Sequence, residues 1–292
     1  MSALSELVAA ELATPAEPEV QDIARAIAVK HGSASRAVLF YGSCLRERRF
    51  DGLMLDFYLI VSDYRSAYSQ SWLAAANRLI PPNVFYFEHG GLRSKYSVLS
   101  EADLERECGP QARSISVLAR FSQPSRLVWS ADEAAEQQTV RSIARCAPTL
   151  LAKTVPLVDS DASAIAVWKR AFSLTYAAEL RAERSERSSH IVDTDPERYE
   201  RFANAALQDG MGPALNRLAT PWWGYMQRKG RLLSLLRLAK ASATFAGGAD
   251  YLAWKINRHS NAGLELTPWQ RRWPVVAAIT LLPRLLKSGA VR

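Results

Sequence analysis

A glycine-serine turn followed by a lone strand carboxylate is the feature of this sequence best suited to chemistry. The apolar run 37–41 stops at Gly42 and Ser43, as a buried strand does when it ends in a turn. Gly42 lets the backbone approach a bulky anion, and Ser43 supplies a hydroxyl and an amide N–H. Asp56 lies in the apolar run 55–61, where a carboxylate is costly unless it is paired, solvated or metal-bound. A turn that holds a triphosphate and an aspartate that holds Mg²⁺ together predict transfer of a nucleotide from a metal-bound nucleoside triphosphate.

The second metal ligand of such a site is not evident. The usual arrangement has a second acid two residues after the first, on the same face of the strand, and here that position is Tyr58. Another segment must therefore supply the second ligand, and Asp51, Asp63 and Glu88 are the nearby candidates. The alternative is an ordinary βα unit with a turn glycine and an aspartate at a strand end.

Length and composition indicate a globular chain without disulfides. With 292 residues, 48% of them hydrophobic, the chain can bury the core of one large domain or two ordinary ones. Its three cysteines have no paired spacing, which argues against a disulfide framework or a zinc site and for a reducing compartment. The first 20 residues carry acids and no Lys or Arg, unlike a targeting sequence. No apolar stretch is long enough to span a membrane.

Charge is distributed very unevenly along the chain. Residues 221–292 carry 12 Lys and Arg against only Asp250 and Glu265, whereas residues 1–220 carry 25 basic and 27 acidic residues. A cationic C-terminal quarter indicates an anionic partner, which is a lipid surface, a nucleic acid or a phosphorylated substrate. A helical core with a solvated basic face is the alternative.

Strand-like and helix-like patterns divide the chain into two parts. The first part predicts an α/β fold, with Gly90 and Gly91 turning between two strands, Pro81 ending a helix, and Ser100 capping the next helix. This part ends near residues 128–129, and residues 183–196 are the most polar segment and are expected to form a loop. The expected strands are 37–41, 55–61, 84–87 and 92–99, and the expected helices are 19–32, 66–80, 132–153, 163–186, 196–209 and 226–245.

Seven segments of the chain, in order along most of its length, resemble a known enzyme family. The family is that of the mitochondrial-type phosphatidate cytidylyltransferases, the CDP-diacylglycerol synthases without transmembrane helices, which includes bacterial members. It has a single aspartate after the Gly-Ser turn, as here. This chain differs from the family at Cys44, where glycine is usual, and at Gln123, where lysine is usual. The matching segments are 41–43, 55–61, 84–87, 95–100, 118–124, 176–181 and 228–231.

The resemblance implies a fold and a reaction. The fold would be α/β, with a nucleotidyltransferase domain built on a mixed sheet over residues 1–131. A mostly helical domain, winged-helix-like in the family, would follow over 132–263, and a basic Trp/Leu-rich segment would dock on the membrane over 264–292. The reaction would be that of CTP with phosphatidic acid, giving CDP-diacylglycerol and pyrophosphate with Mg²⁺.

The resemblance also implies roles for individual residues. Tyr41, Gly42 and Ser43 would bind the nucleotide, with Gly42 and Ser43 cradling the β- and γ-phosphates. Asp56 would hold Mg²⁺. The resemblance does not supply the second ligand, for which Asp51 and Glu88 stay the candidates from the sequence. Lys95 and Arg120 would offset charge on the triphosphate or the lipid phosphate, although a solvated strand lysine and an ordinary ion-pair arginine are the alternatives. The residues expected to contact the lipid substrate are Glu179, Arg181, Arg228 and Lys229.

A lipid substrate implies a place for the protein in the cell. We expect a cytoplasmic protein associated peripherally with the inner face of the cell membrane, since basic residues attract anionic lipids and tryptophans insert shallowly. Trp222, Trp223, Trp254, Trp269 and Trp273 are the candidates for insertion.

Two other readings of the function stay open. The first is a nucleotidyltransferase that acts on a soluble acceptor or an RNA end, although no RNA-reading motif is evident and no nucleic-acid partner is expected. The second is a catalytically inactive adaptor on the membrane surface. The sequence leaves oligomerisation open.

Overall fold

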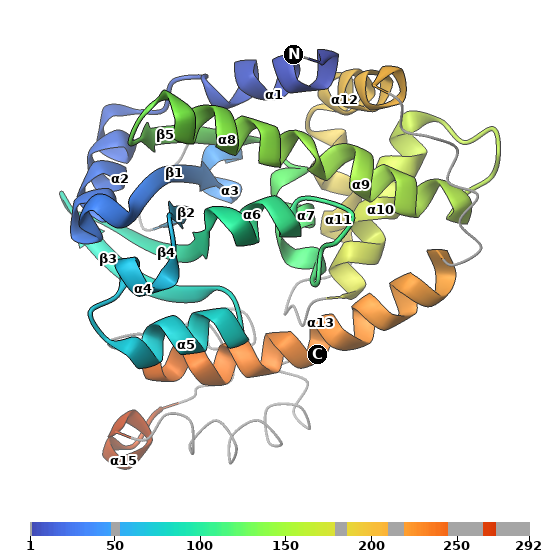
Figure 1. The fold of residues 1–292 in the computed structure, drawn as a ribbon. Helices are drawn as coiled ribbons and strands as arrows, with labels where there is room; N and C mark the ends of the chain where they lie inside the picture. Colours follow the sequence, from blue (N-terminus) through green and yellow to red (C-terminus); the bar gives the residue numbers. More distant parts are fainter. Residues whose placement is uncertain (1, 48–52, 179–185, 210–218, 245–264, 273–292) are drawn as a thin grey trace.

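A five-stranded mixed sheet forms the centre of the protein (Figure 1), whose computed structural model describes residues 2–47, 53–178, 186–209, 219–244 and 265–272. The strand order is β3-β4-β2-β1-β5. β2 and β4 run parallel, and the other three neighbouring pairs are antiparallel. The prediction of an α/β fold with a mixed sheet is therefore confirmed. The strands are β1 (Ser35–Tyr41), β2 (Met54–Val61), β3 (Asn83–His89), β4 (Leu92–Ser100) and β5 (Ser125–Ser130).

The four strands expected from the sequence are present, and the fifth was not expected. β5 pairs antiparallel with β1 at the edge of the sheet. Its residues after Ser125 are only half-buried, and Arg126 and the terminal serines interrupt its apolar pattern. An edge strand of this kind lacks the continuous apolar run that identifies a buried one.

One face of the sheet packs against helices from the first hundred residues. This face presents Val38, Phe40, Phe57 and Leu59, which are fully buried. The covering elements are α2 (Pro18–Lys30), η1 (Gly32–Ala34), α3 (Ser43–Glu47), α4 (Tyr64–Ala67) and α5 (Ser71–Leu79).

The helix expected over 66–80 is interrupted, because α4 ends at Ala67 and α5 begins at Ser71. Tyr68 between them is extended, with φ −128° and ψ 132°. Its ring is buried, and its hydroxyl donates to Oδ1 of Asn77 at 2.9 Å. This buried contact outweighs the helical propensity of the segment.

The other face of the sheet shares one hydrophobic core with the C-terminal helices. Tyr41, Tyr58 and Ile60 of the sheet belong to the same buried cluster as Trp168 and Tyr199 of the helices. The domain boundary at residue 131 stays a prediction, but the described core is continuous across it. The elements on this side are α1 (Ala3–Leu12), α6 (Glu101–Glu107), α7 (Ile115–Phe121), α8 (Glu133–Ala144), α9 (Cys146–Thr154), η2 (Val155–Leu157), α10 (Ala164–Ala177), α11 (Glu186–Asp193) and α12 (Pro196–Gln208).

The described residues after Ser130 form only helices, so a winged-helix unit, which requires a β-hairpin, finds no support among them. The expectation of a loop over 183–196 is wrong for α11. Ile191 and Val192 of α11 are buried against neighbouring helices, and Asp193 pairs with Lys169 at 2.6 Å. This packing holds a polar segment in a helix.

The long helix α13 (Ala219–Thr244) runs from α10 to the edge strand β3, with α5 beside its far end (Figure 1). Gly230 packs closely on α10's end, since an added Cβ would lie 2.2 Å from the carbonyl oxygen of Ala178. The short helix α15 (Pro268–Arg272) is the described part of the C-terminal segment. Within the described parts of the chain, every helix is too short or too polar to cross a bilayer.

Candidate functional site

The register of the sheet places the predicted site residues in one row. Asp56 on β2 pairs with Tyr41 on β1 and with Lys95 on β4, and Lys95 pairs with Tyr86 on β3. Paired residues of neighbouring strands point to the same face. The row continues to Ser125, which pairs with Tyr41. The structure therefore brings together Tyr41, Asp56 and Lys95, which lie far apart in the sequence.

The glycine-serine turn lies directly against the strand carboxylate. Gly42 has a φ of +98°, a conformation that side-chain-bearing residues rarely adopt. A Cβ added there would lie 2.9 Å from Oδ2 of Asp56. Ser43 is exposed and opens α3. Only glycine allows the chain to turn this close to Asp56.

Lys95 is the charge partner of Asp56. Its Nζ lies 3.0 Å from Oδ1 of Asp56, and the two side chains are 29% and 19% exposed. That carboxylate oxygen is buried, and no described residue donates a well-aligned hydrogen bond to it. The attraction between the two charges therefore holds this pair together. The hydrogen-bonding capacity of the carboxylate is not fully used, so Oδ1 can still accept another cation.

Arg120 lies beside the same row. It is in the last turn of α7, and its guanidinium carbon is 5.2 Å from the centre of the Tyr41 ring. The Tyr41 ring also contacts those of Tyr58 and Phe121, at 5.3 and 6.3 Å between centroids. Tyr58, at the position of the missing second acid, is thus a core residue, only 2% exposed. Asp56 and Arg120 therefore lie next to Tyr41, and Lys95 is one strand further along the row.

The candidates for the second metal ligand differ in position. Asp63 lies beyond the opposite end of β2, where its carboxylate caps α4, so it is not a ligand. Glu88 is on the same face as Asp56 but two strands across and two residues along the strand, about 12 Å away at the usual spacings. The Tyr86 hydroxyl donates to Glu88 at 2.8 Å. Burial and this carboxylate raise the pKa of Tyr86. Glu88 stays a prediction, and Asp51 is outside the described residues.

The side chains at this site could bind a metal ion only if a substrate supplied further ligands. In the described ranges, no three His, Cys, Asp or Glu side chains gather closely enough to hold an ion. Mg²⁺ commonly takes one or two carboxylates and completes its coordination with phosphate oxygens and water. Asp56, with its buried and incompletely used oxygen, fits that pattern.

The residues predicted to contact lipid are only partly described. Arg228 is exposed on α13, and Lys229 Nζ lies 5.4 Å from the centre of the Tyr225 ring. The next turn of α13 meets the end of α10, where Nε of Arg231 donates to the carbonyl of Ala177 at 3.3 Å. Glu179 and Arg181 follow directly in the chain but are outside the described residues.

Two of the five tryptophans proposed for membrane insertion belong to the helical core. Trp223 is 2% exposed, and its indole N–H donates to the carbonyl of Lys153 at 2.9 Å. Trp222 packs partly against the same core. Trp269 is 47% exposed and stays a candidate. Trp254 and Trp273 are outside the described residues.

Sequence reasoning missed Tyr86 and Ser125, which extend the row on either side of the three central positions. Ser125 is buried, and among the described residues its hydroxyl has no hydrogen-bond partner. Tyr86 lies within the matching segment 84–87, which assigned it no role, and Ser125 lies outside all of the matching segments. Only strand register, which the sequence does not specify, assigns them to the site.

Comparison with known proteins gives little further information. No family model and no curated protein sequence matches this chain. Among solved structures, that of a nucleotidyltransferase-like protein from Exiguobacterium sibiricum is distantly similar. The TM-score is 0.30 and the sequence identity 10%, over 92% of this chain and 77% of that one. A TM-score this low carries no argument about fold or activity.

Proposed function

We propose that this chain is a nucleotidyltransferase that makes CDP-diacylglycerol and pyrophosphate from CTP and phosphatidic acid. The observation that carries the proposal is the close approach of the Gly42 turn to Asp56, which has Lys95 at 3.0 Å. A bend that only glycine permits, beside a paired carboxylate, is suited to a triphosphate that arrives with its cation. The choice of CTP and phosphatidic acid rests on the resemblance of the sequence segments.

The proposed reaction needs little from the protein beyond positioning and charge. An oxygen of the lipid phosphate bonds to the α-phosphorus of CTP, and the bond from that phosphorus to the bridging oxygen breaks, so pyrophosphate leaves. The attacking phosphate is already anionic, so no strong base is required. Gly42 and Ser43 would hold the β- and γ-phosphates through backbone N–H groups and the Ser43 hydroxyl. Lys95 and Arg120 would neutralise charge on the phosphates.

Mg²⁺ would be held by Asp56 together with the triphosphate, where it supplies charge neutralisation. In the structure, Nζ of Lys95 lies 3.0 Å from Oδ1 of Asp56 and supplies the positive charge beside it. When the nucleotide binds, Lys95 would turn from Asp56 to a phosphate oxygen. This exchange keeps Asp56 paired throughout, which a half-buried carboxylate requires.

Membrane docking is the second part of the proposal. The exposed face of α13 carries Tyr225, Leu232 and Leu236, which are 52%, 57% and 39% exposed, alongside the cations Arg228 and Lys229. An apolar stripe with flanking cations is suited to an anionic lipid surface. Removal of residues 264–292, most of them outside the described residues, should weaken flotation with phosphatidate vesicles more than it weakens CTP binding. Equal loss of both would mean that this segment belongs to the core instead.

One assay tests the reaction. The purified chain is mixed with Mg²⁺, phosphatidic acid micelles and each of the four nucleoside triphosphates, and pyrophosphate release is recorded. CTP should give the fastest release. Asp56→Asn, which keeps the shape of the side chain and removes its charge, should abolish turnover. The matched control is Asp22→Asn, at an exposed ion pair with Arg25, which should leave turnover unchanged.

The other outcomes have definite meanings. Unchanged turnover in Asp56→Asn would remove the proposed metal ligand. Pyrophosphate release with an RNA or a soluble acceptor, but not with phosphatidic acid, would favour the soluble-acceptor reading. If folded protein released no pyrophosphate and CTP with Mg²⁺ gave no thermal protection, the adaptor reading would stand.

A further inference from the structure

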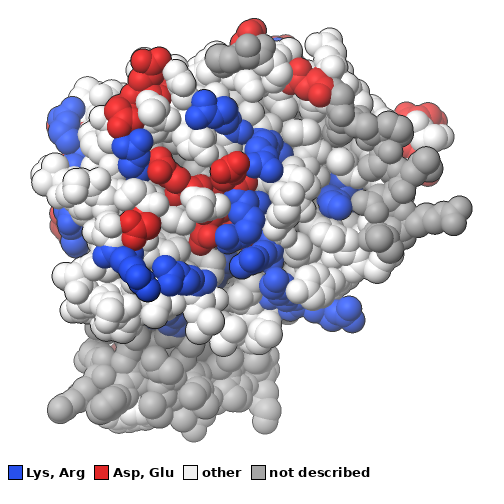
Figure 2. All heavy atoms as spheres, viewed as in Figure 1, with Lys and Arg blue, Asp and Glu red and all other residues white. Residues whose placement is uncertain are grey.

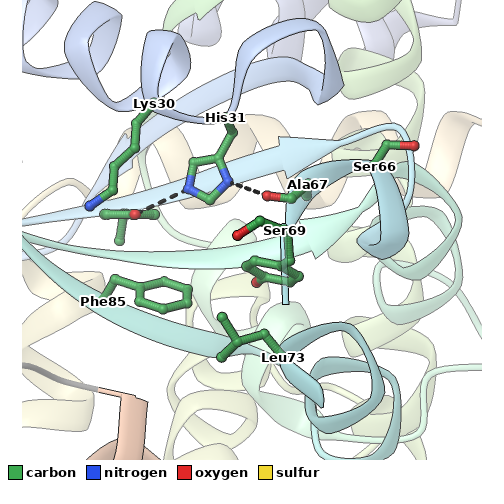
Figure 3. A pocket seen from close by; sticks show the side chains of 9 residues that line it. Lys30, His31, Ser66, Ala67, Ser69, Leu73 and Phe85 are labelled. Atoms are coloured by element: carbon green, nitrogen blue, oxygen red, sulfur yellow. Dashed lines mark hydrogen bonds between the residues drawn. The ribbon is translucent and has the colours of Figure 1, made fainter. Parts of the chain in front are cut away.

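A cavity of about 500 Å³ lies on the face of the sheet opposite to Asp56 (Figure 3). Phe85 and Tyr96 of the sheet line it. The adjacent residues in the chain, Tyr86 and Lys95, point to the opposite face of the sheet. The end of α2 and the connection between α4 and α5 form the rest of the wall. The cavity is therefore separate from the proposed catalytic site, and its function does not depend on that proposal.

Aromatic rings form much of the wall of the cavity, and hydrogen bonds hold those of Tyr68 and Tyr96. The ring of Phe85 lies 6.0 Å from that of Tyr68 and 5.4 Å from that of Tyr96, between centroids. His31 lies between the carbonyl of Ala67, 3.0 Å from Nδ1, and the hydroxyl of Tyr96, 3.1 Å from Nε2. Figure 3 shows His31 on one side of the cavity, with Phe85 and Leu73 facing it.

His31 is a positioning residue and not a base. Since Nδ1 faces a carbonyl, it carries the proton and donates, and Nε2 accepts from Tyr96. Burial and the nearby charge of Lys30 lower the pKa of His31. The imidazole is therefore neutral with both nitrogens occupied, which suits a cavity that binds and does not catalyse.

Three cations and no acid line this cavity and the one beside it. Lys30 is at the edge of the first cavity, with Nζ 5.4 Å from the centre of the Phe87 ring. A second cavity of about 410 Å³ shares Tyr68 and Ser69 with the first and adds Arg65 and Arg78. Such an excess of positive charge around an apolar wall favours an anionic ligand.

We propose that the two adjoining cavities bind a small aromatic anion, a planar ring that carries a phosphate or carboxylate group. The ring would lie against Tyr68 and Phe85 in an offset or edge-to-face arrangement. The acidic group would lie at the edge, towards Lys30 or towards Arg65 and Arg78. The hydroxyl of Ser69, at the junction of the cavities, is a hydrogen-bond donor on the path between them.

Phenyl phosphate is the probe that tests the site, with benzyl alcohol and inorganic phosphate as the two halves of its chemistry. Binding to the full chain is measured by ligand-observed NMR and calorimetry. Phenyl phosphate should bind saturably, with a dissociation constant of roughly 1 mM or tighter, and each half should bind at least about fivefold more weakly. Equal binding of benzyl alcohol would remove the anionic part of the proposal, and no saturable binding would overturn all of it.

Variants locate the binding. Ser69→Trp should block the cavity from its exposed edge and abolish binding. Lys30→Gln combined with Arg78→Gln changes only exposed side chains and should weaken binding by about fivefold to tenfold. Arg25→Gln, an exposed cation on the same helix as Lys30 but outside the cavity, should have no effect. If Ser69→Trp does not fold, the double variant Lys30→Gln, Arg78→Gln is the test by itself. Unchanged phenyl phosphate binding in the double variant would then overturn the proposed site.

Asp56→Asn separates this site from the catalytic one. Phenyl phosphate binding should be unchanged in that variant, because Asp56 points to the other face of the sheet. Loss of binding in Asp56→Asn would assign the probe to the catalytic site and overturn the proposal. Failure of the cytidylyl transfer assay would leave the present site unaffected.

Discussion

At the scale of single residues, Gly42 determines whether the turn and the carboxylate can meet. Two independent features require glycine at this position. Its φ is +98°, and an added Cβ would lie 2.9 Å from Oδ2 of Asp56. Gly42→Ala should therefore cost about 1–3 kcal/mol of unfolding free energy. It should also lower cytidylyl transfer at least tenfold, because the alanine methyl displaces the carboxylate. Urea denaturation and the pyrophosphate assay measure the two effects.

Gly32→Ala is the matched control for Gly42→Ala. Gly32 also has a positive φ, of +56°, but an added Cβ would meet nothing within 4 Å. This variant should lose about 1 kcal/mol of stability from the backbone conformation alone, with turnover retained. If both variants lost activity equally, the close approach to Asp56 would not be the cause.

His31 should make stability depend on pH. Because burial lowers its pKa below the ordinary value of 6.5, the unfolded chain takes up a proton at higher pH than the folded protein does. The contribution of His31 is therefore complete above pH 6.5 and is lost as the pH falls below it. His31→Gln can still donate to Ala67 and accept from Tyr96. It should reduce the loss of unfolding free energy between pH 7.5 and 5.5, measured in urea.

The control for this titration is His190→Gln, at an exposed histidine on α11. The difference between the two variants assigns a change in slope to the buried imidazole of His31 and not to the loss of a histidine as such. A wild-type slope in His31→Gln would show that other groups cause the acid destabilisation.

The central site residues could be predicted from the sequence because each breaks a local pattern. Gly42 and Ser43 stop an apolar run, and Asp56 is a carboxylate within one. Lys95 and Arg120 lie in segments without such a signal and needed the family resemblance. Nothing local identifies their neighbours Tyr86 and Ser125, which depend on pairing between distant strands.

At the scale of elements, Asn77 joins α5 to the sheet. Its side chain is fully buried, donates to the carbonyl of Val98 at 3.0 Å, and accepts from the amide of Asn83 at 2.8 Å and from Tyr68. Asn77→Ala would remove these three buried hydrogen bonds and should cost about 2–4 kcal/mol in urea denaturation. Asn204→Ala, at an exposed site on α12, should cost less than about 0.5 kcal/mol. Equal costs would show that Asn77 is not such a junction.

The same contact explains which elements the sequence predicts poorly. Hydrophobic periodicity identifies β1, β2 and α2, whose buried faces are continuous. It fails where one long-range contact decides, as when Tyr68 leaves the helix to reach Asn77. It fails again for α11, which is mostly polar and is held by two buried residues, Ile191 and Val192.

At the scale of the whole molecule, basic and acidic side chains are interspersed on the face where α6 and α8 lie (Figure 2). Several of them form pairs between elements, as Arg36 does with Glu101 and Asp132 at 3.0 and 2.7 Å. The strong positive charge of residues 221–292 therefore does not extend over this face. The surface over α6 and α8 is therefore not part of the proposed lipid contact, which we assign to α13.

The N-terminal helix connects the two parts of the chain through a buried ion pair. Arg198 of α12 is 3% exposed, and its Nη2 donates to Glu11 of α1 at 3.0 Å. Its Nη1 donates to the carbonyl of Ser122 at 3.1 Å, and its guanidinium carbon lies 4.2 Å from the centre of the Phe202 ring. A guanidinium buried in this way depends on its carboxylate partner. Residues from both sides of position 131 therefore meet at one charge.

Glu11→Ala should accordingly destabilise the entire protein and not only its first helix. An unpaired buried guanidinium costs about 3–5 kcal/mol, and the continuous core transmits that loss to the sheet and the helices together. Far-ultraviolet and near-ultraviolet circular dichroism should show one shared transition, at lower urea than in the unaltered protein.

Arg198→Leu added to Glu11→Ala should restore part of the stability, since no charge is then left buried. Asp22→Ala, at the exposed pair with Arg25, should change little. Two separate transitions would instead mean that the segments before and after residue 131 fold independently.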